Sequence, residues 1–459
     1  MRYTLRLTGA QRETLRAHLF PGDGLEAAAV ARCGRRSAPS HEILTVHEIS
    51  LIPHGECSRG PAHVTWPLGP ALPLFHAAAD QGMAILKIHS HPRDVTDFSP
   101  RDSKGDSDVL GTMFTWTPNP VAHVSAFMLE HGRIVARAYR RDGTTVPIDR
   151  VSVIGDAIEL SDADETAWAA EEHDLRNVQT FGKGTVRQLK KLSAGVVGTS
   201  GTGSWVVEML ARLGVGRLLL VDPDRIEGKN LNRIVNSTRQ HVREGCRKVD
   251  ALKAAVEKME FGTAVGVEGA DLRSATILLQ LAECDVLFGC VDSPFPRSLL
   301  NALATYYTIP YFDVGVRLVA DGKGGISSVY GGVHYLVPGG STLFTRAVIS
   351  YESVRADCLR RYHPEQYQAE VRAKYIEGID EESPAVIPVN GVLSSHMVME
   401  FLARLHPFRC LDLDMTRGQM LDLATCVWSK ADFSETDPYW VKFVGRGDRS
   451  PLLGDPTLT

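Results

Sequence analysis

The stretch that most constrains the fold is 193–233, which has the pattern of a strand, a turn, a helix and a second strand. An apolar run at 194–197 enters the turn, a helical pattern covers 205–213, and a second apolar run at 217–221 ends on Asp222. The turn holds three glycines, Gly198, Gly201 and Gly203. Glycine lets a backbone approach a phosphate, and a helix N-terminus offers free N–H groups. The stretch therefore predicts a nucleotide-binding crossover of about 30 residues.

The residues that follow this unit favour ATP over a nicotinamide dinucleotide. Asp222 opens a D-P-D motif, Asn230 and Arg233 lie in N-L-N-R, and Lys248 ends G-C-R-K. An enzyme that attacks the α-phosphate of ATP must neutralise a triphosphate, and Arg and Lys side chains do this. A dehydrogenase, for which the glycine turn alone would serve, is a distant alternative.

The chain beyond Lys248 alternates helices and strands. Apolar strand patterns at 264–268, 285–290 and 311–316 are separated by helical segments, including one at 296–307. This alternation predicts a doubly wound, mainly parallel sheet. Asp292 follows one strand directly, at the sheet edge where ligands of such folds bind.

Together these motifs resemble the ThiF/MoeB and ubiquitin-activating enzyme family over 176–405, and C-V-D-S-x-x-x-R around Asp292 adds to the match. The resemblance implies that Asp222 holds the ATP ribose and that Asp292 binds or positions Mg²⁺. It implies triphosphate contacts for Asn230, Arg233 and Lys248. Arg176 resembles an arginine that the family donates across a dimer to its partner's ATP, so a homodimer is expected.

Two positions depart from the family pattern. Ser200 stands where the turn usually has another glycine, and 332–346 lack the C-x-x-C that often holds a structural zinc. We expect adenylation to survive both changes. Enzymes of this group that pass their substrate to sulfur use a cysteine in the following crossover, where Cys358 lies among arginines that could lower its pKa. The alternative is an ordinary half-buried cysteine on a helix.

The N-terminal part carries a different pattern, His89-Ser90-His91, followed by Ser99 and Asp102. Residues i and i+2 of an extended segment point to the same side, so both imidazoles can face one ion. Two histidines and a carboxylate with room for water form an open catalytic zinc site.

This spacing resembles the JAMM (JAB/MPN) metalloprotease family over most of 1–150. The resemblance makes His89, His91 and Asp102 the zinc ligands and gives Ser99 a part in stabilising the tetrahedral intermediate. A glutamate from an early strand would be the general base through the zinc-bound water. Glu26 fits best because it opens the apolar strand 26–33, while Glu42 and Glu48 are rivals.

These patterns predict an α/β protein in four parts. An α+β JAMM-type domain spans 1–155 and is followed by an acidic linker at 156–175. A Rossmann-like adenylation domain spans 176–409. A small extension, with strands near 420–428 and 440–444, covers 410–459. The net charge of −5 does not suggest a nucleic-acid partner. Eight scattered cysteines without a C-x-x-C pair argue against a disulfide framework. No signal sequence or long apolar run is evident, so we expect a cytoplasmic protein without membrane contact.

The combined motifs predict ATP-dependent adenylation of the C-terminal glycine of a ubiquitin-like protein, with a thioester at Cys358 and transfer to a conjugating enzyme. The zinc domain would process or remove the same protein. Such fusions resemble bacterial ubiquitin-like conjugation systems, some of them associated with antiphage defence. Activation of a sulfur-carrier protein and a catalytically silent scaffold that binds zinc and nucleotide are the alternatives.

Overall fold

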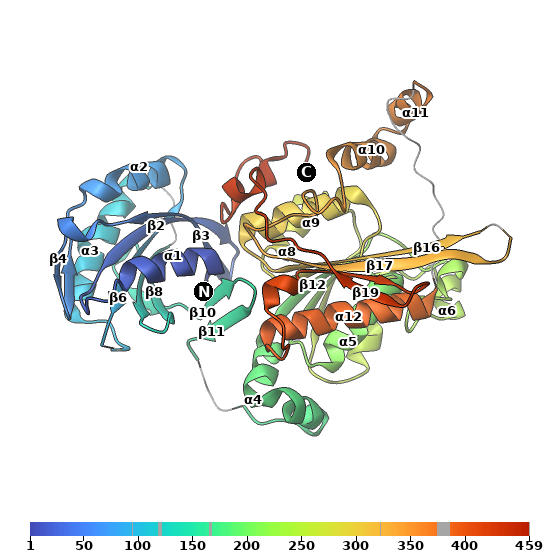
Figure 1. Cartoon of the computed structure of the whole chain (residues 1–459), viewed down its shortest axis with the longest axis horizontal. Helices are drawn as coiled ribbons and strands as arrows, with labels where there is room; N and C mark the ends of the chain where they lie inside the picture. The colour runs from blue at the N-terminus through green and yellow to red at the C-terminus, as the bar shows by residue number, and fades with distance from the viewer. Residues whose placement is uncertain (94, 118–121, 165–167, 322, 374–385, 459) are drawn as a thin grey trace. The chain divides into compact units, whose positions relative to one another are not determined.

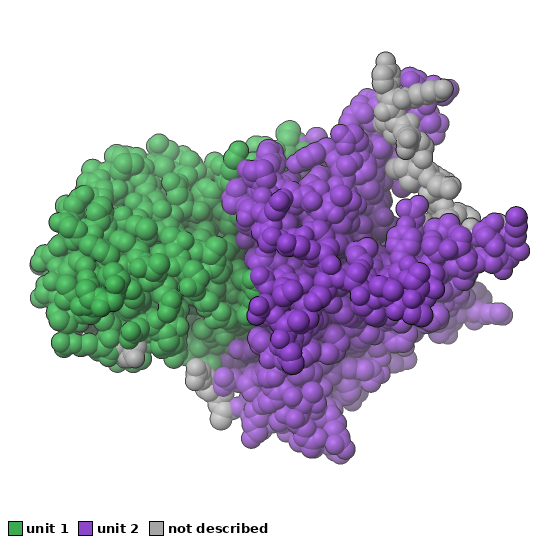
Figure 2. Space-filling model, in the orientation of Figure 1, with its two compact units in different colours: residues 1–166, 305–308, 442–456 green, residues 167–304, 309–441, 457–459 purple. Residues whose placement is uncertain are grey.

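A computed structural model describes residues 1–459 except 94, 118–121, 165–167, 322, 374–385 and 459 (Figure 1). The chain forms two compact units (Figure 2). Unit 1 comprises 1–166, 305–308 and 442–456, and unit 2 comprises 167–304, 309–441 and 457–459. Among the described helices, none combines the length and the apolar character that a bilayer crossing requires.

Unit 1 is built on a nine-stranded mixed sheet with the strand order β11-β10-β1-β3-β2-β6-β7-β8-β9. Its strands are β1 (Arg2–Thr8), β2 (Ala28–Ser37), β3 (His41–Leu51), β6 (Ala84–His91), β7 (Ala122–Leu129), β8 (Ile134–Arg140), β9 (Thr145–Pro147), β10 (Arg150–Ile154) and β11 (Ile158–Asp162), and β4 (Ser58–Gly60) pairs with β5 (His63–Thr65). Its helices are α1 (Gly9–Leu19), α2 (Leu72–Asp80) and α3 (Pro100–Trp116).

The sheet of unit 1 is buried on both faces. Along β2, Ala29 and Ala31 belong to a core cluster that includes Leu15 of α1, while Val30 belongs to a second cluster that includes Leu110 of α3. Successive strand residues point to opposite faces, so α1 covers one face and α2 with α3 the other. Glu26 lies two residues before β2 and does not open that strand.

Unit 2 contains an eight-stranded mixed sheet with the order β14-β13-β12-β15-β16-β17-β18-β19. The pairs from β14 to β16 are parallel and those from β16 to β19 antiparallel. Its strands are β12 (Ser193–Val197), β13 (Arg217–Val221), β14 (Ala264–Glu268), β15 (Val286–Gly289), β16 (Tyr311–Ala320), β17 (Ile326–Leu336), β18 (Gly418–Asp422) and β19 (Val427–Lys430). The mixed α/β class is confirmed.

Helices cover both faces of this second sheet. The helices of unit 2 are α4 (Leu175–Lys191), α5 (Gly201–Arg212), α6 (Arg239–Arg243), α7 (Lys248–Glu257), α8 (Ala275–Leu281), α9 (Pro294–Tyr307), α10 (Tyr351–Tyr362), α11 (Pro364–Arg372) and α12 (Ile387–Leu405). Figure 1 shows α5 and α12 on one face and α8 and α9 on the other. Val197 pairs with Val221 on one side and Gly289 on the other, so the loops that follow β12, β13 and β15 leave the sheet at one edge.

The C-terminal residues divide between the two units. Residues 410–459, grouped from the sequence as one extension, contribute β18 and β19 to unit 2 and return to unit 1 at 442–456. The strand predicted at 440–444 is wrong, because Trp440–Phe443 is a 3₁₀ helix. A glycine-rich segment follows, and Gly445 O accepts hydrogen bonds from Gly34 N (3.1 Å) and Thr45 Oγ1 (2.9 Å).

Candidate functional sites

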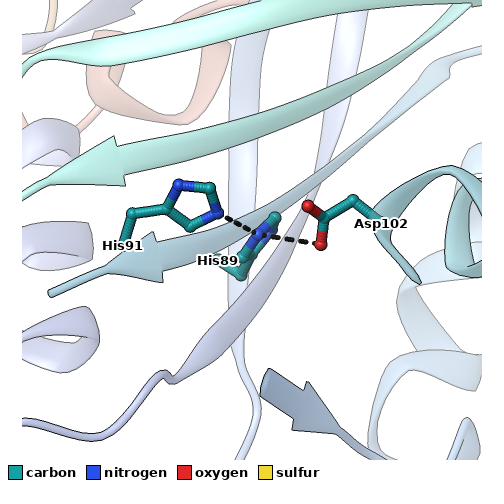
Figure 3. A group of neighbouring side chains, drawn as sticks. All are labelled: His89, His91 and Asp102. Carbon is teal, nitrogen blue, oxygen red and sulfur yellow. Dashed lines mark hydrogen bonds and ion pairs between the residues drawn. The ribbon is translucent and has the colours of Figure 1, made fainter. Parts of the chain in front are cut away.

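The predicted metal ligands of unit 1 lie together at one end of the sheet. His89 and His91 lie in the last three residues of β6, Asp102 lies in the first turn of α3, and one ligand atom from each lies within 4.8 Å of the others. His89 Nε2 is 3.0 Å from His91 Nε2 and 3.2 Å from Asp102 Oδ1 (Figure 3). His91 Nδ1 is 2.6 Å from Val95 O, an outer contact that leaves Nε2 for an ion. The donor set fits a zinc ion with an open position.

The S-x-x-D motif has a local structural role. Ser99 and Asp102 form a capping box at the start of α3, and Asp102 Oδ2 accepts from Ser99 N and Oγ, both at 2.7 Å. Burial opposes ionisation, but the hydrogen bonds from His89 and Ser99 outweigh it and hold the pKa of Asp102 below its usual range. Ser99 therefore turns the carboxylate so that Oδ1 faces His89.

Of the three candidate bases, Glu26 is the one that lies near the candidate metal ligands His89, His91 and Asp102. The chain beside it pairs with β6, since Ala28 lies opposite His89 and Ala27 N donates to Ser90 Oγ at 2.9 Å. Burial, and then the nearby Asp102 carboxylate, raise the pKa of Glu26 to about 7. The rivals are engaged elsewhere, Glu42 in an ion pair with Arg35 (2.8 Å) and Glu48 in one with Arg32 (2.6 Å).

Two supporting groups of this site were missed from the sequence. Phe127 of β7 stacks on His91 with ring centroids 4.0 Å apart. Asp106, one turn after Asp102 and fully buried, accepts from Lys87 Nζ (2.7 Å), Ser125 Oγ (2.9 Å) and Arg137 Nη2 (2.7 Å). These bonds tie α3 to three strands. The sequence did carry a signal for this network: Asp102 and Asp106 lie four residues apart, and Lys87 interrupts an apolar strand.

The glycine turn of unit 2 has steric reasons for its composition. Gly198 has a φ of +84°, and a Cβ there would lie 2.6 Å from Cys290 O. A Cβ on Gly203 would lie 1.8 Å from Gly198 O. Ser200, the departure from the family pattern, occupies the N-cap of α5 without a side-chain cap hydrogen bond.

Asp222 and Lys248 meet at the end of β13. Asp222 Oδ2 accepts from Thr199 N (2.7 Å), which joins the carboxylate to the glycine turn. Lys248 Nζ is 2.6 Å from Asp224 Oδ2 and 3.7 Å from Asp222 Oδ1. The fold thereby places Lys248 beside Asp224 of the D-P-D motif, although the two residues are 24 positions apart in the chain.

The remaining residues predicted to bind the nucleotide differ in how closely they approach the glycine turn. Asn230 is buried and accepts from Glu227 N at 3.0 Å. Arg233 Cδ lies 3.4 Å from the place a Cβ on Gly201 would take, so this side chain lies at the start of α5. Asp292 is exposed in the loop between β15 and α9. Arg176, exposed on α4, bonds Gln179 of the same helix.

Cys358 lies half-buried on α10, and this helix packs against the loop of Asp292. Arg361 Nη2 donates to Ser293 Oγ (2.5 Å), and Phe295 N donates to Asp357 Oδ2 (3.1 Å). The arginines proposed to activate the thiol are engaged by carboxylates: Arg355 with Glu370, and Arg360 and Arg361 with Asp357. Their charge is therefore largely offset.

Hydrogen bonds join a second segment to the region 332–346, where the cysteine pair of the family pattern is missing. Thr342 Oγ1 donates to Asp437 Oδ2 at 2.6 Å, and Asp437 N donates to Gly340 O at 3.1 Å. Ser341 Oγ donates to Phe433 O at 3.0 Å. Residues 340–342 and 433–437 are thus held together by side-chain hydroxyls and a carboxylate.

The sequence profile of the ThiF family matches residues 173–426, which is more than half of the chain. The chain belongs to the ThiF family. The match includes the glycine turn, Asp222, Lys248, Asp292 and Cys358. It does not reach the candidate metal ligands of unit 1, so the JAMM assignment stays a prediction.

Curated proteins similar to this ThiF-family chain match part of it. Ubiquitin-like modifier-activating enzyme 5 of Bombyx mori is 26% identical over 171 residues, covering 35% of this chain and 41% of that protein. tRNA threonylcarbamoyladenosine dehydratase of Bacillus subtilis (strain 168) is 42% identical over 81 residues, covering 18% and 31%. The chain thus spans less than half of the length of either relative.

Solved structures are also similar to the ThiF-family chain. E. coli MccB with ATP has a TM-score of 0.43 and 20% identity, covering 59% of this chain and 74% of that one. E. coli MccB with MccA-N7isoASN has a TM-score of 0.46 and 19% identity at the same coverage.

Proposed function

We propose that unit 2 of this ThiF-family protein adenylates the C-terminal glycine of a ubiquitin-like protein with Mg²⁺ and ATP. The observation that carries the proposal is the meeting of Asp222, Lys248 and Arg233 around the glycine turn. A carboxylate oxygen of the substrate attacks the α-phosphorus, the bond to the β-phosphate oxygen breaks, and pyrophosphate leaves.

The charged side chains have separate roles in this step. Lys248 and Arg233, with Asn230, contact the triphosphate and offset the charge that builds on the leaving pyrophosphate. Asp222 binds the ribose, and the exposed Asp292 is the carboxylate that would hold Mg²⁺. Arg176, which lies exposed on α4, would serve the partner's site in a homodimer.

The acyl group then passes to Cys358. Its thiolate attacks the acyl-adenylate carbonyl, the thioester forms and AMP leaves with the electron pair. Support comes from α10, which packs through Asp357 and Arg361 on the loop that carries Asp292. The thioester would next pass to a conjugating enzyme.

For unit 1 we propose a zinc peptidase that trims or removes the same ubiquitin-like protein. His89, His91 and Asp102 would hold the ion, which supplies Lewis acidity to a water molecule when bound. Glu26, buried beside Asp102, would accept the proton of the attacking water and deliver it to the leaving amine, and Ser99 would help to stabilise the tetrahedral intermediate. The two activities suit a cytoplasmic bacterial conjugation pathway, of which antiphage defence is one setting.

The test is ATP–pyrophosphate exchange with a panel of ubiquitin-like proteins that end in glycine. Wild type is expected to exchange, and Asp292→Ala to lose exchange. Cys358→Ala should keep exchange but form no thioester on a non-reducing gel, while Cys426→Ala, which removes an exposed cysteine, should behave as wild type.

Other outcomes would point elsewhere. A thioester that persists in Cys358→Ala removes the cysteine assignment. Product formation that requires a sulfur donor and survives Cys358→Ala favours activation of a sulfur-carrier protein. Zinc and ATP binding without exchange for any panel member favours the silent scaffold.

A further inference from the structure

The N-termini of α5 and α12 meet in unit 2, and Asn390 lies between them. A Cβ built on Gly201, the first residue of α5, would stand 2.1 Å from Asn390 Nδ2. Ser394, one turn further along α12, donates through Oγ to Thr202 O at 2.9 Å and holds the two helices together. Asn390 therefore faces the start of the nucleotide-binding helix, beside Arg233.

This junction is positively polarised. Neither α5, of 12 residues, nor α12, of 19, has a side-chain hydrogen bond at its N-cap. Free N–H groups and the helix dipoles place partial positive charge at both N-termini. Arg233 passes beside Gly201 with its Cδ, and its guanidinium donates through Nη1 to Lys229 O at 2.9 Å.

Two donors at the junction lack an acceptor within the described part of the chain. Asn390 is 3% exposed, and its Nδ2 has no hydrogen-bond partner among the residues that the structure describes. Trp205 Nε1 also has no hydrogen-bond partner among the described residues, and it lies 3.5 Å from the place of a Cβ on Gly391. Buried donors are nearly always satisfied in folded proteins, so these two N–H groups are available to an acceptor on a ligand.

We infer that Asn390 is a ligand-binding residue that donates through Nδ2 to an anionic oxygen of the reactants. The oxygen belongs either to the phosphates of ATP or to the terminal carboxylate that becomes the acyl group of the adenylate. The inference rests on the proposed adenylation. It also explains Gly201, because any larger residue there would displace the amide.

Equilibrium binding to the 459-residue chain tests this assignment. The probes are adenosine, Mg-ATP and 5′-O-(glycylsulfamoyl)adenosine, a stable analogue of the glycyl-adenylate. Asn390→Asp keeps the shape but replaces the donor with a negative oxygen. Ser394→Ala is the matched control, because it removes a contact between the same helices without touching the ligand.

Adenosine should bind Asn390→Asp as it binds wild type. At least about tenfold weaker binding of Mg-ATP identifies a phosphate oxygen, and the same loss for the glycyl analogue alone identifies the acyl oxygen. Unchanged affinity for all three probes overturns the inference, as does a loss for adenosine that Ser394→Ala shares. A wild-type protein that binds neither nucleotide nor analogue overturns the proposed function, and the inference with it.

Discussion

Asp106→Asn should loosen α3 and weaken the metal site although the residue contacts none of the proposed ligands. The side chain of Asp106 is fully buried and faces Lys87 and Arg137, each at 2.7 Å. Asparagine has nearly the same shape but carries no charge and has one acceptor oxygen. The change leaves two cationic side chains together without a counter-ion.

The size of the effect follows from these contacts. Removing one partner of a buried ion pair costs about 3–5 kcal/mol, and the acceptor that asparagine retains recovers about 1 kcal/mol. The net loss of stability in unit 1 is therefore about 2–4 kcal/mol. Because Asp102 lies one turn before Asp106 on α3, we also expect zinc affinity to fall by about tenfold or more.

Hydrogen exchange is the suitable assay because a chain with two units need not unfold in one step. Amides of α3 should exchange about 30-fold faster or more in Asp106→Asn, and zinc should be released at lower chelator concentration. Asp108→Asn is the control, since Asp108 is exposed on the same helix. If exchange in α3 and zinc affinity are the same in both variants and in wild type, the network does not position Asp102.

Three further changes test other parts of the molecule. Glu26→Gln should keep zinc, measured by metal analysis, but lower cleavage of a ubiquitin-like fusion at least about 100-fold if Glu26 is the base. Gly445→Ala should cost about 2–4 kcal/mol in thermal unfolding because φ is +69° and the new Cβ would lie 2.1 Å from a main-chain oxygen, whereas Gly22→Ala, with φ +92° and open space, should cost about 1 kcal/mol. Equal losses would refute the steric argument. Thr342→Val should lower the urea stability by about 1–3 kcal/mol because Asp437 Oδ2 loses its donor, although Asp437 Oδ1 keeps its hydrogen bonds from Tyr439 N and Trp440 N. No change would show that this hydrogen bond does not take the place of the missing cysteine pair.

Much of the prediction of the fold and of the candidate sites rested on local sequence patterns. The glycine turn, the H-x-H pair and S-x-x-D each lie within a few residues, so backbone geometry and sequence spacing suffice to place their members. The alternation of strand and helix in 193–316 likewise predicts the parallel part of the second sheet, because each strand is a short buried apolar run. The strand at 440–444 failed because a short apolar run has no periodicity that separates a strand from a 3₁₀ turn.

By itself, then, the sequence determined membership of the ThiF family, and it predicted a zinc site in unit 1 from residues adjacent to one motif. Tertiary structure decided what depends on contacts between distant residues. It places Glu26, and not Glu42, near the candidate metal ligands, it pairs Asp437 with Thr342, and it sets Asn390 against the glycine turn. From the sequence alone, Glu26, Glu42 and Glu48 are equally good candidates for the general base. No local pattern indicates which of them the strand register places near His89. That choice is made by strand pairing and burial, which join residues far apart in the chain.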